Sequence, residues 1–173
     1  MSSTSTTTQN LSEVEVFRHQ NQVTNAVVHL NLADVTHDES LVRPSPAGNC
    51  VNWVLGHLSC IYNNVLPLLG ESPVPEQAAL KRYDRGSAPI THRADAMNIS
   101  DLIRIWDESV KRIDAGLAKL TSEKLDQRVP ISPTNNPNET VRSLLSTIAF
   151  HQAYHAGQLG VLRRIAGKPG AIA

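Results

Sequence analysis

The sequence predicts an all-α protein, a four-helix bundle with a long crossover between helices 2 and 3. Four segments carry apolar residues at intervals of three and four, which gives a helix one apolar face, and almost none alternates apolar and polar residues as a strand does. Residues typical of helix starts and stops bound these segments. Amphipathic helices without strands bury their apolar faces against one another, and the result is a bundle.

The chain has 173 residues, a length that suits one domain with one hydrophobic core. We therefore expect a single helical-bundle domain over residues 1–173. Residues 1–11 are expected to be disordered, because this stretch is polar and rich in Ser and Thr. Only 4% of the residues are aromatic, so the core is expected to consist mainly of Leu, Ile, Val and Ala.

The first helix is expected from about Ser12 to Leu32. Ser12 and Glu15 have the spacing of a capping box, in which each side chain binds the backbone N–H of the other residue. The apolar side of this helix is expected to include Val16, Val23, Val27 and Leu30.

The second helix is expected from Asn49, as N-cap, to about Leu66, where Pro67 stops it. The crossover that follows, Gly70–Asn98, is rich in Pro and Gly, with a short helix expected around Glu76–Lys81. Structureless connections of this length are uncommon in compact domains and are often functional. Two interpretations stay open: a strap along the bundle, or a lid over a site.

The third helix has the clearest pattern, with apolar residues at Leu102, Trp106, Val110, Ile113, Leu117 and Leu120. A stretch with three prolines then breaks the chain. We expect the fourth helix to start with Asn136 as cap, Pro137 as first helical residue and Glu139 closing a capping box. It should extend to about Ile165 and end before Gly167.

Charge and cysteine content exclude several classes of function. The formal net charge is zero, so the basic excess typical of nucleic-acid-binding proteins is absent. No uncharged apolar run is long enough to span a membrane. Cys50 and Cys60 would be roughly 15 Å apart on one helix, too far for a disulfide. Free thiols and a start unlike a signal peptide lead us to expect a cytoplasmic protein.

Two histidines occupy positions that the periodicity of the fourth helix reserves for the core. His151 and His155 are four residues apart, so their rings project from one helix face and can converge on one metal ion. Burying two adjacent imidazoles without a shared partner is costly, and a metal ion removes that cost. Core histidines bonded to neighbouring side chains remain an equally good interpretation of the pair alone.

A third ligand would have to come from another helix, and His57 is the best candidate. It lies in NWVLGHLSC, on a face that the spacing directs inward. A lone histidine on such a face is more often a core residue, and what favours this one is the need of the HxxxH pair for a partner. HExxH, Walker A and GxGxxG motifs are absent, as are ExxH motifs on the inward faces.

These stretches resemble the DinB/YfiT-like superfamily of metalloenzymes. The resemblance rests on GHL around His57, on HQAYHAGQLGVLRR from His151 onward, and on the lead-in RPSPAGNCVNWVLGHL. It extends roughly from His19 to Lys168 and is specific at the three histidines and the HxGQ turn. It implies a four-helix bundle that holds one metal ion through His57, His151 and His155.

The resemblance also implies zinc or nickel as the metal, a homodimer, and a small-molecule substrate that reacts with help from a low-molecular-weight thiol. Three imidazoles leave one to three coordination positions open, as in catalytic sites. Near them, Gln158 and Tyr154 are candidates for orienting a ligand or bound water, and Cys60 is a candidate fourth ligand. The alternatives stay open: a polar residue at the bundle end, a tyrosine directed at a neighbouring helix, and a small buried cysteine, which is the more common role of a free thiol.

Two functions remain open at this point. The first is a metal-dependent transferase, isomerase or hydrolase acting on a small substrate. The second is a non-catalytic, stress-related interaction protein in which the metal only stabilises the bundle, because the sequence shows neither a general base nor a substrate motif.

Overall fold

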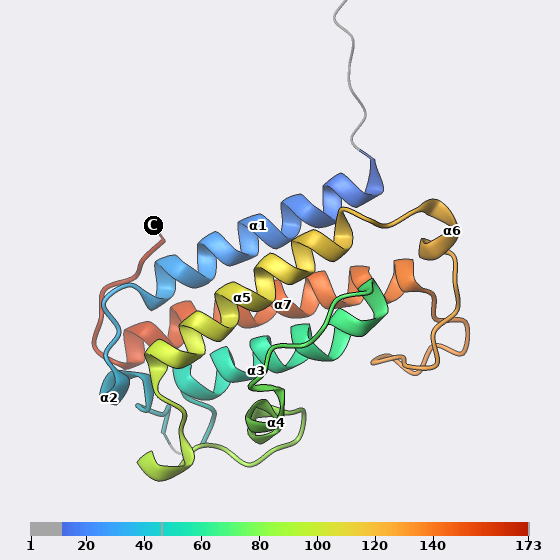
Figure 1. Cartoon of the computed structure of the whole chain (residues 1–173). Coiled ribbons are helices and arrows are strands. Elements are labelled where there is room, and N and C mark those ends of the chain that lie inside the picture. Colours follow the sequence, from blue (N-terminus) through green and yellow to red (C-terminus); the bar gives the residue numbers. More distant parts are fainter. Residues whose placement is uncertain (1–11, 46, 173) are drawn as a thin grey trace, which may run out of the picture.

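Four long helices make up the bundle in the computed structural model, which describes residues 12–45 and 47–172 (Figure 1). They are α1 (Glu13–Leu32), α3 (Val51–Val65), α5 (Ile99–Leu117) and α7 (Val141–Ile165). Within the described residues there is no strand, only an isolated bridge between Arg128 and Thr140. The all-α prediction is confirmed, whereas the expected disorder of residues 1–11 lies outside the described residues.

The direction of the helices explains the long crossover. Figure 1 shows α1 and α7 running one way and α3 and α5 running the opposite way. Helix α1 packs chiefly against α7, and α3 against α5. Since α3 and α5 are parallel neighbours, the chain must return along the length of the bundle between them. Residues 66–98 make that return.

Short helices occupy the connections. They are α2 (His37–Ser40), η1 (Leu66–Leu69), α4 (Gln77–Leu80), η2 (Lys81–Tyr83), η3 (Arg93–Asp95) and α6 (Ser122–Leu125), where η denotes a 3-10 helix. The short helix expected around Glu76–Lys81 corresponds to α4. None of the helices in the described ranges is long and apolar enough to cross a membrane.

The predicted start of the fourth helix was wrong by four residues. Thr140 is the N-cap of α7, and it forms a capping box with Ser143. Asn136 and Pro137 precede it in a turn, and Glu139 is buried, accepting hydrogen bonds from the hydroxyls of Ser132 and Ser143. The backbone N–H of Val129 donates to the carbonyl of Glu139, and that of Val141 donates to the carbonyl of Gln127. These two bonds pair the stretch with the preceding loop and keep Glu139 out of the helix.

Two smaller boundaries also differ from prediction. The N-cap of α3 is Cys50 rather than Asn49. Helix α5 ends at Leu117, so Leu120 packs against the core from the turn beyond it. The capping box of Ser12 and Glu15 at the start of α1 is confirmed.

The buried face of α1 agrees only in part with the predicted one, because Val27 packs against the core but the other three predicted residues are exposed. Val23 and Leu30 are each 49% exposed, and Val16 is 40% exposed. The helix instead buries Asn21, Thr24, Val28, Asn31 and Leu32. Two polar members of this face form hydrogen bonds with other helices: Asn21 accepts from the Tyr62 hydroxyl at 2.7 Å, and Asn31 donates to the carbonyl of Ala156 at 3.2 Å. Polar pairing between helices therefore overrides the apolar pattern.

Candidate metal centre

His57 lies in the middle of α3, the most deeply buried helix. It is 4% exposed, and its ring stacks on Trp53 with centroids 4.8 Å apart. Its Nδ1 lies 2.8 Å from the carbonyl oxygen of Tyr83 in the crossover. A carbonyl can only accept, so Nδ1 carries the proton and donates it. The lone pair of His57 is consequently on Nε2, the nitrogen that faces α7.

Gly56 allows this contact. A Cβ atom at position 56 would lie 2.4 Å from the ring of Tyr83, so only glycine lets the crossover approach α3 so closely. The Tyr83 hydroxyl donates to Asn52 at 3.0 Å and accepts from the backbone N–H of Met97 at 2.8 Å. The hydroxyl of Tyr83 is therefore fixed by two hydrogen bonds and its ring by packing on Gly56, so its carbonyl is a rigid acceptor for His57.

The other two histidines lie one turn apart on α7. The Nδ1 of His155 is 2.6 Å from Oε1 of Gln158, an acceptor, so it donates and leaves Nε2 unprotonated. The Nδ1 of His151 is buried and has no hydrogen-bond partner. Its Nε2 lies 3.1 Å from Nε2 of His57.

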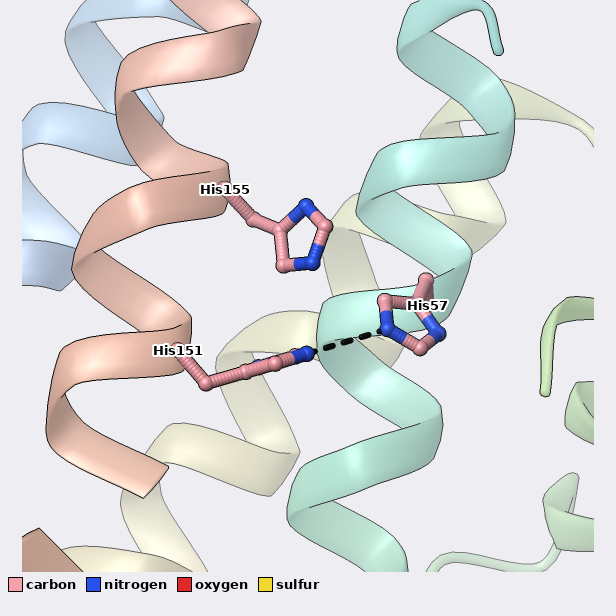
Figure 2. Close-up of side chains that lie close together, drawn as sticks. All are labelled: His57, His151 and His155. Atoms are coloured by element: carbon pink, nitrogen blue, oxygen red, sulfur yellow. Dashed lines mark hydrogen bonds between the residues drawn. The ribbon is translucent and has the colours of Figure 1, made fainter. Parts of the chain in front are cut away.

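The three rings converge between α3 and α7 (Figure 2). The Nε2 atoms of His57 and His151 are 3.1 Å apart, and one nitrogen from each ring lies within 4.8 Å of the others. Nitrogens that each bind a metal ion at 2.0–2.1 Å are separated by about 3 Å. The separation of His57 and His151 matches this value, and the set of three imidazole donors suits one divalent transition-metal ion.

Burial keeps these imidazoles in the form that binds metals. It is the main cause of a lowered pKa at all three, and it brings the pKa of His151 to about 4 with help from the charges of His155 and His57. Neutral imidazole is the metal ligand. At neutral pH the group consequently needs no deprotonation before an ion binds.

A cavity of roughly 620 Å³ opens beside the three rings. Its apolar wall comes from α3, from α7 and from the loop before α7, and includes Ile61, Ile131, Pro133, Ile148 and Phe150. The crossover adds Asp84 and Arg85. A volume of this size is typical of small-molecule sites. A metal ion held here would have coordination positions facing the cavity.

The accessory residues predicted from sequence lie in different places. Gln158 contacts His155 directly. Tyr154 lines the cavity with its ring 5.2 Å from that of His155, and it is 57% exposed. Cys60 is buried outside the group of converging ligand atoms, and burial raises the pKa of its thiol to about 11.

Sequence reasoning missed the crossover residues Tyr83, Asp84 and Arg85. The signal that was available is Gly56, a glycine in the interior of a helix, directly before His57. Such a glycine indicates that another segment approaches the backbone closely. The crossover is thus part of the site rather than a strap alone.

The fold and the site define a helical-bundle protein with a group of three histidines at a cavity. The chain belongs to the DinB superfamily, whose family model matches residues 20–159. This confirms the resemblance seen in the sequence. The match spans α1 to most of α7 and includes all three histidines.

A solved structure agrees with the fold. The chain is similar to a conserved protein of Enterococcus faecalis, with a TM-score of 0.71 at 18% sequence identity, covering 92% of this chain and 100% of the other. At that identity the similarity supports the fold alone. No curated protein matches the sequence.

Proposed function

We propose that the protein binds one divalent transition-metal ion, zinc or nickel, through His57, His151 and His155, and that this centre catalyses transfer, isomerisation or hydrolysis on a small substrate. The observation that carries the proposal is the convergence of three neutral imidazoles beside a cavity. A structural site is normally closed by a fourth protein ligand, whereas a three-ligand site facing a cavity keeps positions for water or substrate.

The protein's own residues prepare the site in three ways. Tyr83 and Gln158 hold the rings of His57 and His155 in the tautomer that presents Nε2. The apolar wall limits water around the reacting groups. A bound ion would act as a Lewis acid and lower the pKa of a water or thiol beside it.

A low-molecular-weight thiol is the co-reactant that we propose for the transfer and isomerisation routes. This part of the proposal is supported by membership of the DinB superfamily and by a cavity large enough for a thiol together with a small electrophile. In the proposed hydrolytic route, water takes the place of the thiol in the cavity.

The experiment loads the purified protein with zinc or nickel and measures consumption of thiol by a panel of small electrophiles, with ester hydrolysis in parallel. His155→Ala should abolish activity. His29→Ala is the matched control, because His29 is exposed on α1, where its ring lies 2.7 Å from Asp107. Equal activity in wild type and His155→Ala would refute catalysis at this centre. A metal-loaded wild type that is stabilised but inactive on every substrate would favour the non-catalytic alternative.

We also propose that the protein is a homodimer. Adjacent helices expose large apolar side chains: Val16, Val23 and Leu30 on α1, and Phe150, Val161 and Ile165 on α7. The three apolar residues of α1 are seven residues apart, so they lie on one face of the helix. Sedimentation equilibrium should show a dimer that Val23→Glu with Val161→Glu dissociates, while Val42→Glu, outside this face, leaves it intact. An unchanged mass for the double variant would refute this interface.

We propose that the protein is cytoplasmic. Both cysteines are free and buried, which suits a reducing compartment. Fractionation of cells that express the chain should recover it with cytoplasmic markers, and recovery with secreted proteins would contradict this.

A further inference from the structure

The crossover brings one arginine without a partner to the cavity. Apart from the histidines, Asp84 and Arg85 are the charged side chains that line it. Arg18 and Arg104 pair with carboxylates at 2.8 Å and 2.7 Å, but the guanidinium of Arg85 has no hydrogen bond or ion pair within residues 12–45 and 47–172. The Asp84 carboxylate accepts instead from the backbone N–H of Arg85, at 2.7 Å.

The backbone on both sides of Arg85 is anchored by other residues. Before it, Tyr83 is buried against Gly56 and receives the hydrogen bond from His57. After it, Ser87 accepts from the Trp53 indole at 3.1 Å. The side chain of Arg85 takes no part in these contacts. The fold therefore holds the segment in place while leaving the guanidinium available for a ligand.

The charge of the cavity favours an anion. Three neutral imidazoles with one divalent ion carry two positive charges, and Asp84 only offsets Arg85. In a cavity with apolar walls such a field is weakly screened, so it concentrates anionic ligands.

We propose that Arg85 binds the anionic group of the substrate, and that the centre acts on small organic monocarboxylates with an apolar body. The guanidinium fork matches a carboxylate through two parallel N–H···O bonds. Ile61, Ile148 and Phe150 would contact the apolar part. A single arginine suits a monoanion better than a phosphate dianion, which usually takes several donors. This inference rests on the proposed metal centre.

The test measures binding rather than turnover. Hexanoate, 4-phenylbutyrate and their uncharged amides are titrated calorimetrically into zinc-loaded wild type, Arg85→Ala, Arg85→Lys and Lys81→Ala. Lys81 is an exposed cation in the same crossover that does not line the cavity, so its removal matches the change in net charge. Arg85→Ala should bind both carboxylates roughly 10- to 100-fold more weakly, as expected for a lost charge-assisted pair. Arg85→Lys should recover part of the affinity, and Lys81→Ala should resemble wild type.

Three results would overturn the inference: equal carboxylate affinity in Arg85→Ala and wild type, amides that bind wild type as tightly as their acids, or no binding of either acid. Zinc content is measured on the same samples. If wild type holds one zinc per chain and Arg85→Ala binds the carboxylates as tightly as wild type, the role of Arg85 is refuted and the proposed metal centre is not. If wild type holds no zinc, the proposed function fails, and the same comparison on metal-free protein still decides whether Arg85 binds carboxylates.

Discussion

Replacing Gly56 with alanine should destabilise the fold and disturb the metal centre together. The new Cβ would lie 2.4 Å from two ring carbons of Tyr83, where ordinary contacts are about 3.5–4 Å. The ring is fully buried and tied to Asn52 and Met97, so it cannot retreat without losing hydrogen bonds. Overpacking costs about 1–3 kcal/mol and a lost bond about 1 kcal/mol, against about 1 kcal/mol gained from higher helix propensity. The net loss should be about 1–3 kcal/mol.

Gly157→Ala is the matched control. It is also a helical glycine, but it is exposed, and nothing lies within 4 Å of its would-be Cβ. The control should gain up to about 1 kcal/mol from helix propensity. Urea unfolding of metal-free protein measures stability, and chelator competition measures zinc affinity. Zinc affinity should fall about 10- to 100-fold in Gly56→Ala, because the carbonyl of Tyr83 moves away from His57. Equal stability and equal zinc affinity in the two variants would refute the argued role of Tyr83.

Three further predictions concern single groups. Metal-free protein should lose stability as the pH falls from about 6.5 toward 4, because the histidines have a folded pKa below their unfolded 6.5 and the unfolded chain binds more protons. The loss of stability attributable to His151 should be on the order of 2 kcal/mol. In urea unfolding, the free energy of His151→Leu should therefore depend less on pH than that of wild type, and an equally steep dependence in the variant would contradict this. Asn63→Ala should lower the free energy of unfolding in urea by about 3 kcal/mol, because the Asn63 amide forms hydrogen bonds with Ser109 and with the Val74 N–H in the core. The control, Asn64→Ala at an exposed position, should change it by less than about 0.5 kcal/mol, and equal effects of the two variants would contradict this. Gln158→Ala should weaken zinc binding about 10- to 100-fold in chelator competition, because the substitution removes the hydrogen-bond acceptor of the His155 Nδ1. The control, Gln22→Ala on α1, should leave zinc affinity unchanged, and an unaltered affinity in Gln158→Ala would contradict this.

Much of the fold was predictable because local signals and core packing agree. The pattern of α5 and the Ser12 capping box lie where the sequence indicated them. The α7 start was not predictable in the same way, because Asn136, Pro137 and Glu139 have the right spacing for a cap. In the structure Glu139 instead accepts hydrogen bonds from two hydroxyls, and this arrangement depends on contacts with the preceding loop.

In the candidate site too, residues positioned by local spacing were predictable, and residues positioned by tertiary contacts were not. Spacing of four residues on one helix was enough to pair His151 with His155, since i and i+4 share a face. His57 needed the bundle to bring α3 against α7, and family resemblance supplied what periodicity did not. Tyr83 and Arg85 come from a crossover without hydrophobic periodicity, so their position depends on tertiary contacts with Gly56 and Trp53.

Metal stoichiometry in histidine variants tests the central claim most directly. Purified protein is loaded with zinc, desalted and analysed by elemental mass spectrometry, for wild type and for alanine variants of His57, His151 and His155, with His29→Ala as control. We predict one ion per chain in wild type and His29→Ala, and a loss of most bound zinc in each of the other three. Full zinc content in any of these three variants, or none in wild type, would contradict the account.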